Sequence, residues 1–315
     1  MINPILHEYP ASPFSEKIRA IFGYKAMSYQ SVTIPVIMPK PDLIPLTGGY
    51  RRTPVMQIGA NIYCDTRLIT QVIETLQPTP SLYPKEQDAT VNMVGQWADQ
   101  HLFRISVALF SSPAGLQAFT AAVPKAVSEA FAADRKAMRR MGISNPIHPD
   151  VAYSHMQVYL QQLNSQLAGG HNQERDFIFG NEPTLADFSI YHCLWFVQRN
   201  EGISAILNPF SAVIDWMQRI KEFGHGKVEL IGSEKAIDIA KNTDVKEPEN
   251  SAISFVGFNR GDRVTVVGTD LGIDPVEGSL VAAAGDEIVI RRQDERAGEL
   301  LVHFPTIGYH LAAVK

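Results

Sequence analysis

The stretch RRTPVMQIGANIYCDTRLI, from Arg51 to Ile69, decides the fold of this chain. Two short apolar runs around a glycine predict a hairpin over residues 55–58 and 61–63. The apolar spacing that follows predicts a helix over residues 65–76, with Asp65 and Thr66 at its start. A helix start presents free N–H groups and the positive end of its dipole, so it can hold a carboxylate. The stretch therefore predicts an anion site.

A second recognition element precedes the hairpin. Thr53 and Pro54 come directly before its first strand. A cis bond at this pair would turn the neighbouring amide and carbonyl groups outward, where a ligand can reach them. Together with the helix start, the pair favours a small, peptide-like anion as the ligand.

The residues upstream complete a small α/β domain over residues 1–80. The pattern predicts a strand over residues 4–9, a helix over 15–24 and a second strand over 29–34. Residues 35–49 are rich in proline and glycine, which argues against one regular element there. The resulting order of strand, helix, strand, irregular segment, hairpin and helix is compatible with a thioredoxin-like domain.

Two further domains follow, joined by a helix and a linker. Residues 85–224 predict an all-helical bundle, with helices over 88–110, 151–167, 184–199 and 210–223 and a weaker one over 119–141. Residues 225–250 predict one helix, 233–242, and a polar linker. Residues 251–315 predict strands over 263–269, 278–283, 287–292, 299–304 and 309–314, separated by turns. Five short strands favour a small β-barrel of SH3-like type, so the fold class is α+β with three domains.

The composition narrows the class of protein. The chain has 315 residues, 45% apolar and 19% charged, a balance typical of two or three globular domains. Its net charge of −5 argues against partners such as nucleic acids or anionic membranes. Cys64 and Cys193 are the only cysteines, which excludes a disulfide framework and favours a reducing compartment. We see no signal segment, membrane-spanning apolar run, metal-ligand spacing or nucleotide loop, and expect a cytoplasmic protein without a bound metal.

Thr184 and Asp187 form a capping-box pattern at the start of a bundle helix. Thr184 can accept from the third amide of the helix, and Asp187 can bond back to the N–H of the cap. We interpret the pair as a structural cap, so loss of Asp187 should impair folding before catalysis.

These motifs, in this order and spacing, resemble the glutathione S-transferase superfamily over residues 4–224. The resemblance implies that Asp65 and Thr66 hold the γ-glutamyl end of glutathione, although the pair alone would favour a plain helix cap. It implies that Thr53 and a cis Pro54 meet the cysteinyl part. Arg51 or Arg52 would meet the glycyl carboxylate, with a solvated surface pair as the alternative.

The catalytic position in this superfamily lies just after the first strand, and here the sequence is YPASPFSEKIR, from Tyr9 to Arg19. A hydroxyl near a helix N-terminus can donate to a thiolate and lower the pKa of the thiol. Ser12 is the first candidate and Tyr9 the second, with Ser15 interpreted as the helix N-cap. Because this loop has no cysteine, thiol–disulfide exchange by it is not expected.

The resemblance implies an enzyme that transfers the glutathione thiolate to a small hydrophobic electrophile bound between the two domains, and a homodimer. Alternatives are a non-catalytic binding or scaffold protein of the same fold, or a glutathione-dependent isomerase, dehalogenase or peroxidase. The C-terminal strands are expected to serve structural packing, with protein contact, dimer support or a lid over the pocket as further roles.

Overall fold

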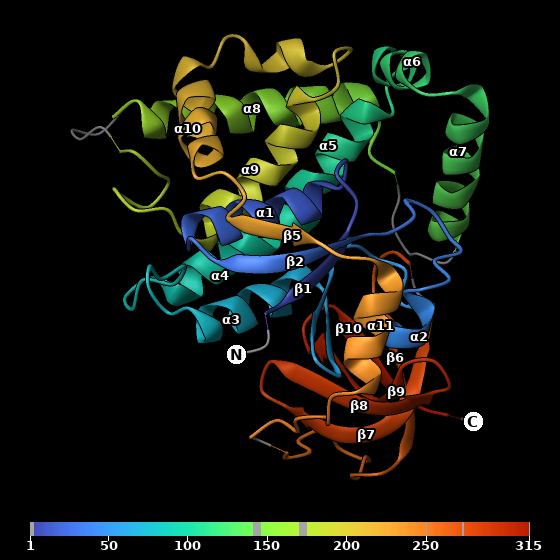
Figure 1. Ribbon diagram of the computed structural model, residues 1–315. Helices are drawn as coiled ribbons and strands as arrows, with labels where there is room; N and C mark the ends of the chain where they lie inside the picture. Colours follow the sequence, from blue (N-terminus) through green and yellow to red (C-terminus); the bar gives the residue numbers. More distant parts are fainter. Residues whose placement is uncertain (1–2, 141–145, 170–174, 250, 273, 315) are drawn as a thin grey trace.

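The computed structural model describes residues 3–140, 146–169, 175–249, 251–272 and 274–314 (Figure 1). Helices form a layer on one side of an N-terminal sheet, and a strand-rich part lies at the far end of that sheet. The ten strands of the described residues belong to a single sheet in the order β10-β6-β7-β8-β9-β4-β3-β1-β2-β5. The sheet thus joins the first and last parts of the chain.

The N-terminal part has the predicted thioredoxin-like arrangement. Strand β1 pairs parallel with β2 and antiparallel with β3, and β3 forms the predicted hairpin with β4. The segment with many prolines also contains a short helix, α2, which ends at Gly48 with a φ of 78°. The elements are β1 (Ile5–Glu8), α1 (Pro13–Tyr24), β2 (Ser28–Thr33), α2 (Ile44–Thr47), β3 (Val55–Ile58), β4 (Asn61–Cys64) and α3 (Thr66–Leu76).

The helical part follows the predicted pattern with two differences. The expected helix over 119–141 is divided in two at Val123 and Pro124, since proline lacks an N–H and disfavours a helical residue before it. The expected helix over 88–110 contains one π-helical turn, Ala98–Leu102. The helices are α4 (Asp88–Trp97), α5 (Phe103–Phe110), α6 (Pro113–Ala122), α7 (Lys125–Arg140), α8 (Pro149–Leu167), α9 (Leu185–Gln198), a 3-10 turn (Ser204–Leu207) and α10 (Ser211–Glu222).

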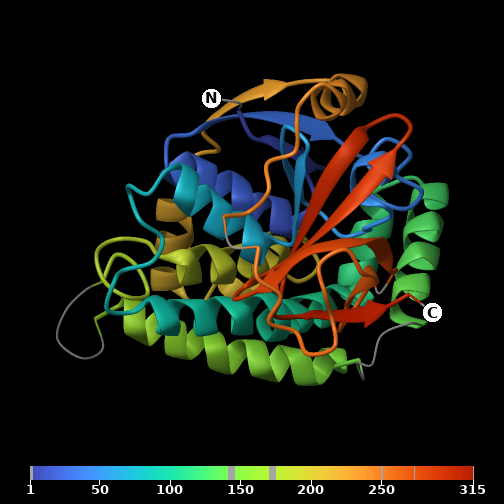
Figure 2. The same ribbon diagram turned by 90° about the horizontal axis from the view of Figure 1, so that it is seen from below.

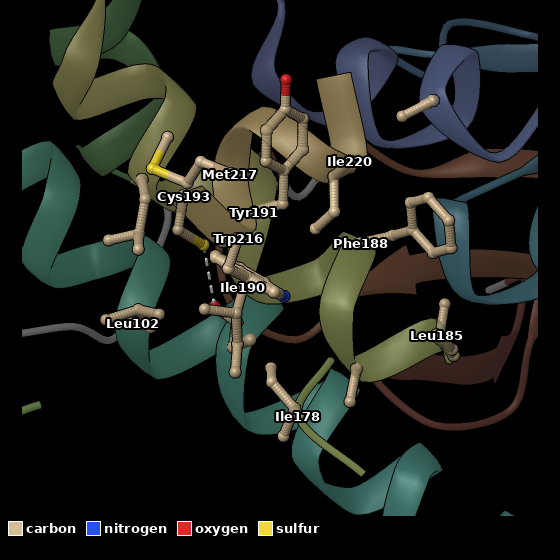
Figure 3. Close-up of a cluster of buried hydrophobic side chains, with 14 of the residues drawn as sticks. Leu102, Ile178, Leu185, Phe188, Ile190, Tyr191, Cys193, Trp216, Met217 and Ile220 are labelled. Atoms are coloured by element: carbon tan, nitrogen blue, oxygen red, sulfur yellow. Dashed lines mark hydrogen bonds between the residues drawn. The ribbon is translucent and has the colours of Figure 1, made fainter. Parts of the chain in front are cut away.

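Helix α9 is the centre of the helical core. Its buried side chains include Phe188, Tyr191 and Leu194, and the Tyr191 ring packs against Trp216 of α10 with 6.5 Å between the ring centroids. Trp216 is 0% exposed, and Figure 3 shows it with Tyr191 and Phe188 in this cluster of buried side chains. Burial of aromatic and aliphatic side chains of this size is the main stabilising contribution to the fold. Helix α9 carries apolar side chains on several sides, with Phe188 and Tyr191 on one side and Cys193 on another. This distribution is typical of a helix that is buried all round.

The segment between the bundle and the last strands differs from the expectation of one helix and a linker. It contains β5 (Lys227–Leu230), which pairs parallel with β2 at the sheet edge. Helix α11 (Ser233–Lys241) follows and packs Ala236, Ile237 and Ala240 into the core beneath it. This helix lies beside the junction of the N-terminal sheet and the last strands (Figures 1 and 2).

The C-terminal region, residues 251–314, is called the β unit here. Its five strands lie where the sequence predicted them, as an antiparallel series in which β10 returns to β6. Strand β9 also pairs parallel with β4, so the β unit continues the N-terminal sheet. The strand-rich class is confirmed, and closure into an SH3-like barrel stays a prediction. The strands are β6 (Arg263–Gly268), β7 (Val276–Ala284), β8 (Glu287–Asp294), β9 (Gly298–Pro305) and β10 (Tyr309–Ala313).

Among the described residues, no single helix has both the length and the apolar character needed to cross a membrane. One bent pair, Asp88–Phe110 with Pro113–Ala122, meets these two criteria when its members are taken together, with a 75° bend between them.

Candidate functional site

A small cavity of about 60 Å³ lies where the three parts of the chain meet. Three of the predicted site residues line it: Arg52, Asp65 and Thr66. The other lining residues come from α1, α3, the α4 region and the β unit: Phe14, Arg67, Gln96, Asp99, Gln100, Asp270, Ile307 and Gly308. A wider hollow of about 410 Å³ beside α11 is open and contains none of these groups; it is lined by Lys235, Asp238, Ile239, Asn242 and Thr243.

Asp65 is the N-cap of α3, and its carboxylate accepts a hydrogen bond from the Arg67 N–H at 3.0 Å. The residue has a φ of 75°, a backbone conformation that costs a non-glycine residue on the order of 1–3 kcal/mol and that is enriched at ligand sites. The other carboxylate oxygen accepts from the Tyr309 hydroxyl at 3.0 Å and lies 3.7 Å from Arg52 Nη1. Asp65 is therefore both a cap and a partner of the β unit.

Thr66 is the first residue of α3 and is 3% exposed. The first N–H groups of a helix have no intrahelical acceptors, so this end of α3 presents donors and a positive dipole to the cavity. Arg67 adds a guanidinium whose Nε is buried without a partner among the described residues. Sequence reasoning missed Arg67, although its place in the first turn beside Asp65 and Thr66 was visible.

The Thr53–Pro54 peptide bond is cis, as the sequence predicted. Thr53 does not line the cavity, and its hydroxyl accepts from the Lys40 ammonium at 2.7 Å. Lys40 is 2% exposed and also donates to the Arg51 carbonyl at 2.9 Å. Burial, with the nearby Arg135 charge, lowers the pKa of Lys40 to about 8. This buried ammonium holds the segment that precedes β3, and no sequence signal identified it.

Both predicted arginines are paired with carboxylates. Arg51 contacts Asp134 of α7 at 2.7 Å and Asp274 of the β unit at 3.3 Å. Arg52 pairs with Asp270, and its Nε donates to the Leu271 carbonyl at 3.0 Å. The alternative of a solvated surface pair is therefore wrong, because the Arg51 side chain is only 9% exposed and the Arg52 side chain 21%.

The start of α1 differs in one respect from the prediction. Ser12, rather than Ser15, is the N-cap, and its hydroxyl oxygen accepts from the Ser15 N–H at 3.2 Å. Pro13 explains the difference. Proline is favoured at the first position of a helix, so the helix begins at Pro13 and the residue before it, Ser12, is the cap. Neither Ser12 nor Tyr9 lines the cavity, whereas Phe14, in the first turn of α1, does.

A buried ionic cluster closes the cavity on the bundle side. Asp99, in the π-helical turn, lies 2.6 Å from Lys17 Nζ and 2.9 Å from His192 Nε2. Burial raises the pKa of the Asp99 carboxyl, but the Lys17 charge and the His192 contact outweigh it and hold the pKa below its ordinary value. Burial also lowers the pKa of His192. The turn thus presents an ionised carboxylate to the cavity.

His101 lies in the same turn, two residues after Asp99, and its Nε2 is 3.3 Å from the Tyr159 hydroxyl. Sequence reasoning also missed the cluster around Asp99. Its one signal was Lys17, a charged residue next to Ile18, and the structure buries both side chains completely. In the described part of the chain, no group of three or more His, Cys, Asp or Glu side chains is arranged to hold a metal ion.

Two segments of the chain match known protein families. Residues 6–81 match the family described as "Glutathione S-transferase, N-terminal domain". Residues 147–224 match the family described as "Glutathione S-transferase, C-terminal domain". No curated protein matches the chain.

Several solved structures are similar to the chain. A GST-like protein from Pseudomonas syringae has 36% sequence identity and a TM-score of 0.81, with 100% of each chain covered, so the likeness includes the β unit. A glutathione S-transferase from Rhodospirillum rubrum has 17% identity and a TM-score of 0.51 over 69% of this chain and 87% of its own. Rice GST1 in complex with glutathione has 17% identity and a TM-score of 0.51, over 75% of this chain and 94% of its own.

Proposed function

Because this chain belongs to the glutathione S-transferase superfamily, we propose that it binds glutathione at the start of α3 and transfers the thiolate to a small apolar electrophile. The observation that carries the proposal is the cavity at the first turn of α3. There Asp65, Thr66 and Arg67 bring a carboxylate, helix N–H groups and a guanidinium to one wall. This set matches the ammonium and carboxylate of a γ-glutamyl group.

In this proposal the ligand runs from α3 across the segment before β3. Thr66 donates to the γ-glutamyl carboxylate, and Asp65 pairs with the ammonium. Thr53 meets the cysteinyl backbone, with Pro54 cis, and Arg51 or Arg52 meets the glycyl carboxylate. The thiol lies near the start of α1, where the helix dipole and a hydroxyl stabilise its anion.

Ser12 has the hydrogen-bonding capacity for this role. Its oxygen uses a lone pair to accept from the Ser15 N–H, which leaves its own proton available for donation. A donated hydrogen bond favours the thiolate over the thiol, so the bound nucleophile is ready at neutral pH. The acceptor electrophile would lie beside Phe14, against the bundle.

The binding site is tested with Asp65→Ala. This variant removes the partner of the ammonium and a helix cap, so we expect glutathione affinity, measured by calorimetry, to fall at least about tenfold, as for a lost charge-assisted hydrogen bond. The matched control is Ser112→Ala, which removes the equivalent N-cap of α6, where Ser112 accepts from the Gly115 N–H at 3.2 Å. Undiminished binding by Asp65→Ala would show that the site assignment is wrong.

The catalytic assignment is tested with Ser12→Gly, since glycine as an N-cap costs only a few tenths of a kcal/mol relative to serine. We expect the ultraviolet absorbance of bound thiolate at neutral pH to fall and turnover of a general electrophile to drop by about 10²-fold, as for a lost oxyanion donor. Tyr9→Phe is the parallel variant. If thiolate absorbance and turnover fall only in Tyr9→Phe, the donor to the thiolate is the Tyr9 phenol and not Ser12.

A second candidate is a binding protein of the same fold without turnover. One observation favours it: neither candidate hydroxyl, that of Ser12 or of Tyr9, lines the cavity. It predicts glutathione binding with no thiolate signal in wild type. An isomerase, dehalogenase or peroxidase would keep the same glutathione site and differ in the second substrate.

A further inference from the structure

The end of strand β6 lies directly on the arginines that precede β3. Arg52 pairs with Asp270 and donates to the Leu271 carbonyl. A Cβ added at Gly268 would lie 2.2 Å from Arg52 Nη2, and one at Gly272 would lie 3.1 Å from Arg51 Cγ. A side chain at Gly268 would displace the end of the Arg52 side chain, so the absence of a Cβ there leaves the guanidinium in its place against the β unit.

The contact is charged as well as close. Burial disfavours the charged Arg52 guanidinium, yet Tyr309, Tyr50, Asp270 and Asp65 surround it, and the pKa of Arg52 is raised above its ordinary value. The Tyr309 ring lies 5.4 Å from the guanidinium carbon, and its hydroxyl donates to Asp65. Arg52 thus already has a carboxylate partner, supplied by the chain itself.

The Asp270 contact contributes little to holding the β unit in place. The Asp270 side chain is 46% exposed, and exposed ion pairs contribute little to the stability of a fold. The β unit is attached independently by the pairing of β9 with β4 and by the 2.8 Å contact between the Tyr309 and Tyr50 hydroxyls. The pair can therefore be given up without loss of the fold.

The cavity is also too small for a tripeptide. At about 60 Å³ it holds little more than a few water molecules, whereas small-molecule sites typically have about 300–1,000 Å³. Asp270 and Gly308 of the β unit are among the residues that line it. A tripeptide therefore needs some of these contacts to separate before it can enter.

We propose that Asp270 is a specificity-determining residue that occupies, on Arg52, the position of the ligand's glycyl carboxylate and competes with it. The inference rests on the proposed glutathione site and adds that the β unit sets its affinity. A free glycyl carboxylate must displace Asp270 from Arg52 and then lies near a second carboxylate of like charge. A ligand that lacks this carboxylate meets no such competition.

The test compares glutathione with its glycyl monoethyl ester by calorimetry on the full-length protein. We expect Asp270→Asn, which keeps the shape and removes the charge, to bind glutathione about tenfold more tightly than wild type, in line with one charge-assisted hydrogen bond regained. The ester, which has no glycyl carboxylate, should bind both proteins equally. Asp270→Ala serves as the second variant, and Asp238→Asn, on the exposed face of α11, as the matched charge control.

The outcomes separate the two proposals. If wild type binds glutathione and Asp270→Asn binds it no more tightly, the role of Asp270 is overturned while the glutathione site stands. An equal gain for the ester likewise overturns it, because the effect would then not involve the glycyl carboxylate. If neither wild type nor the variants bind glutathione, the proposed function fails, and the inference that rests on it fails too.

Discussion

Replacing Asp187 with alanine is expected to lower the free energy of unfolding by about 3–5 kcal/mol. The carboxylate accepts from the Thr184 N–H at 2.8 Å, the Ile178 N–H at 2.9 Å and the Trp216 indole N–H at 3.0 Å. All three donors are buried, and each costs about 1–3 kcal/mol when left without an acceptor. The loss is a large part of the 5–15 kcal/mol that usually stabilises a domain.

The structure contains the Thr184–Asp187 capping box, but the indole and Ile178 contacts make Asp187 more than a cap. It ties the start of α9 to α10 and to the segment before it. A cap alone would be worth about 1 kcal/mol. The size of the measured loss therefore distinguishes the two roles.

Denaturant unfolding followed by Trp fluorescence and by circular dichroism measures this loss. Asp150→Ala is the matched control, because Asp150 is also in the first turn of a helix but its side chain is 93% exposed. We expect the control to change stability by less than about 0.5 kcal/mol. A loss below about 1 kcal/mol for Asp187→Ala would contradict the role as a shared acceptor. Glutathione binding by the protein that remains folded should be unchanged, since Asp187 is not in the cavity lining.

The sequence predicted the features that depend on local pattern. The hairpin around Gly59, the capping box at Thr184 and the five last strands follow from alternation, turn residues and cap chemistry over a few residues. Each of these signals lies within a few neighbouring residues, because a turn, a helix cap or a strand is set by the backbone conformation of those residues. The whole thioredoxin-like order could be assembled from them.

Contacts between distant segments could not be predicted in this way. Strand β5 alternates polar and apolar residues, but over only four positions, which is too short a run to identify a strand, and all four residues are exposed. The pairing of β9 with β4 joins residues more than 200 positions apart and has no local signature. For the same reason, the sequence suggested Arg51 and Arg52 as ligand contacts but did not show Asp270 and Asp274 as their partners.

Lowering the pH from 6.5 towards 4 is expected to destabilise the fold by about 3 kcal/mol through His7 alone. His7 is 1% exposed in the middle of the sheet, and its Nε2 lies 2.8 Å from Gln57 Oε1. The Gln57 amide nitrogen donates to the Gly59 and Ala236 carbonyls, so Oε1 is the acceptor and Nε2 of His7 carries the proton. This hydrogen bond places the proton of the neutral ring on Nε2.

Burial, only partly opposed by the Gln57 hydrogen bond, lowers the pKa of His7 from 6.5 to about 4. Between these two values the unfolded chain binds a proton that the folded chain excludes. Protonation therefore favours the unfolded state, and stability is complete above about pH 6.5 and declines as the pH falls. His192, whose pKa burial also lowers, acts in the same direction, whereas Asp187, whose pKa burial raises, acts in the opposite one.

The difference between wild type and His7→Gln isolates the contribution of His7, because both proteins keep His192 and Asp187. Glutamine places its amide nitrogen where Nε2 lies and can still donate to Gln57, but it does not titrate. We expect the stability of wild type relative to His7→Gln, from urea unfolding, to fall by about 3 kcal/mol between pH 7 and pH 4. His155→Gln, at an exposed position of α8, should run parallel to wild type. Parallel curves for wild type and His7→Gln would mean that His7 accepts a proton in the folded state, and that burial does not hold the ring neutral.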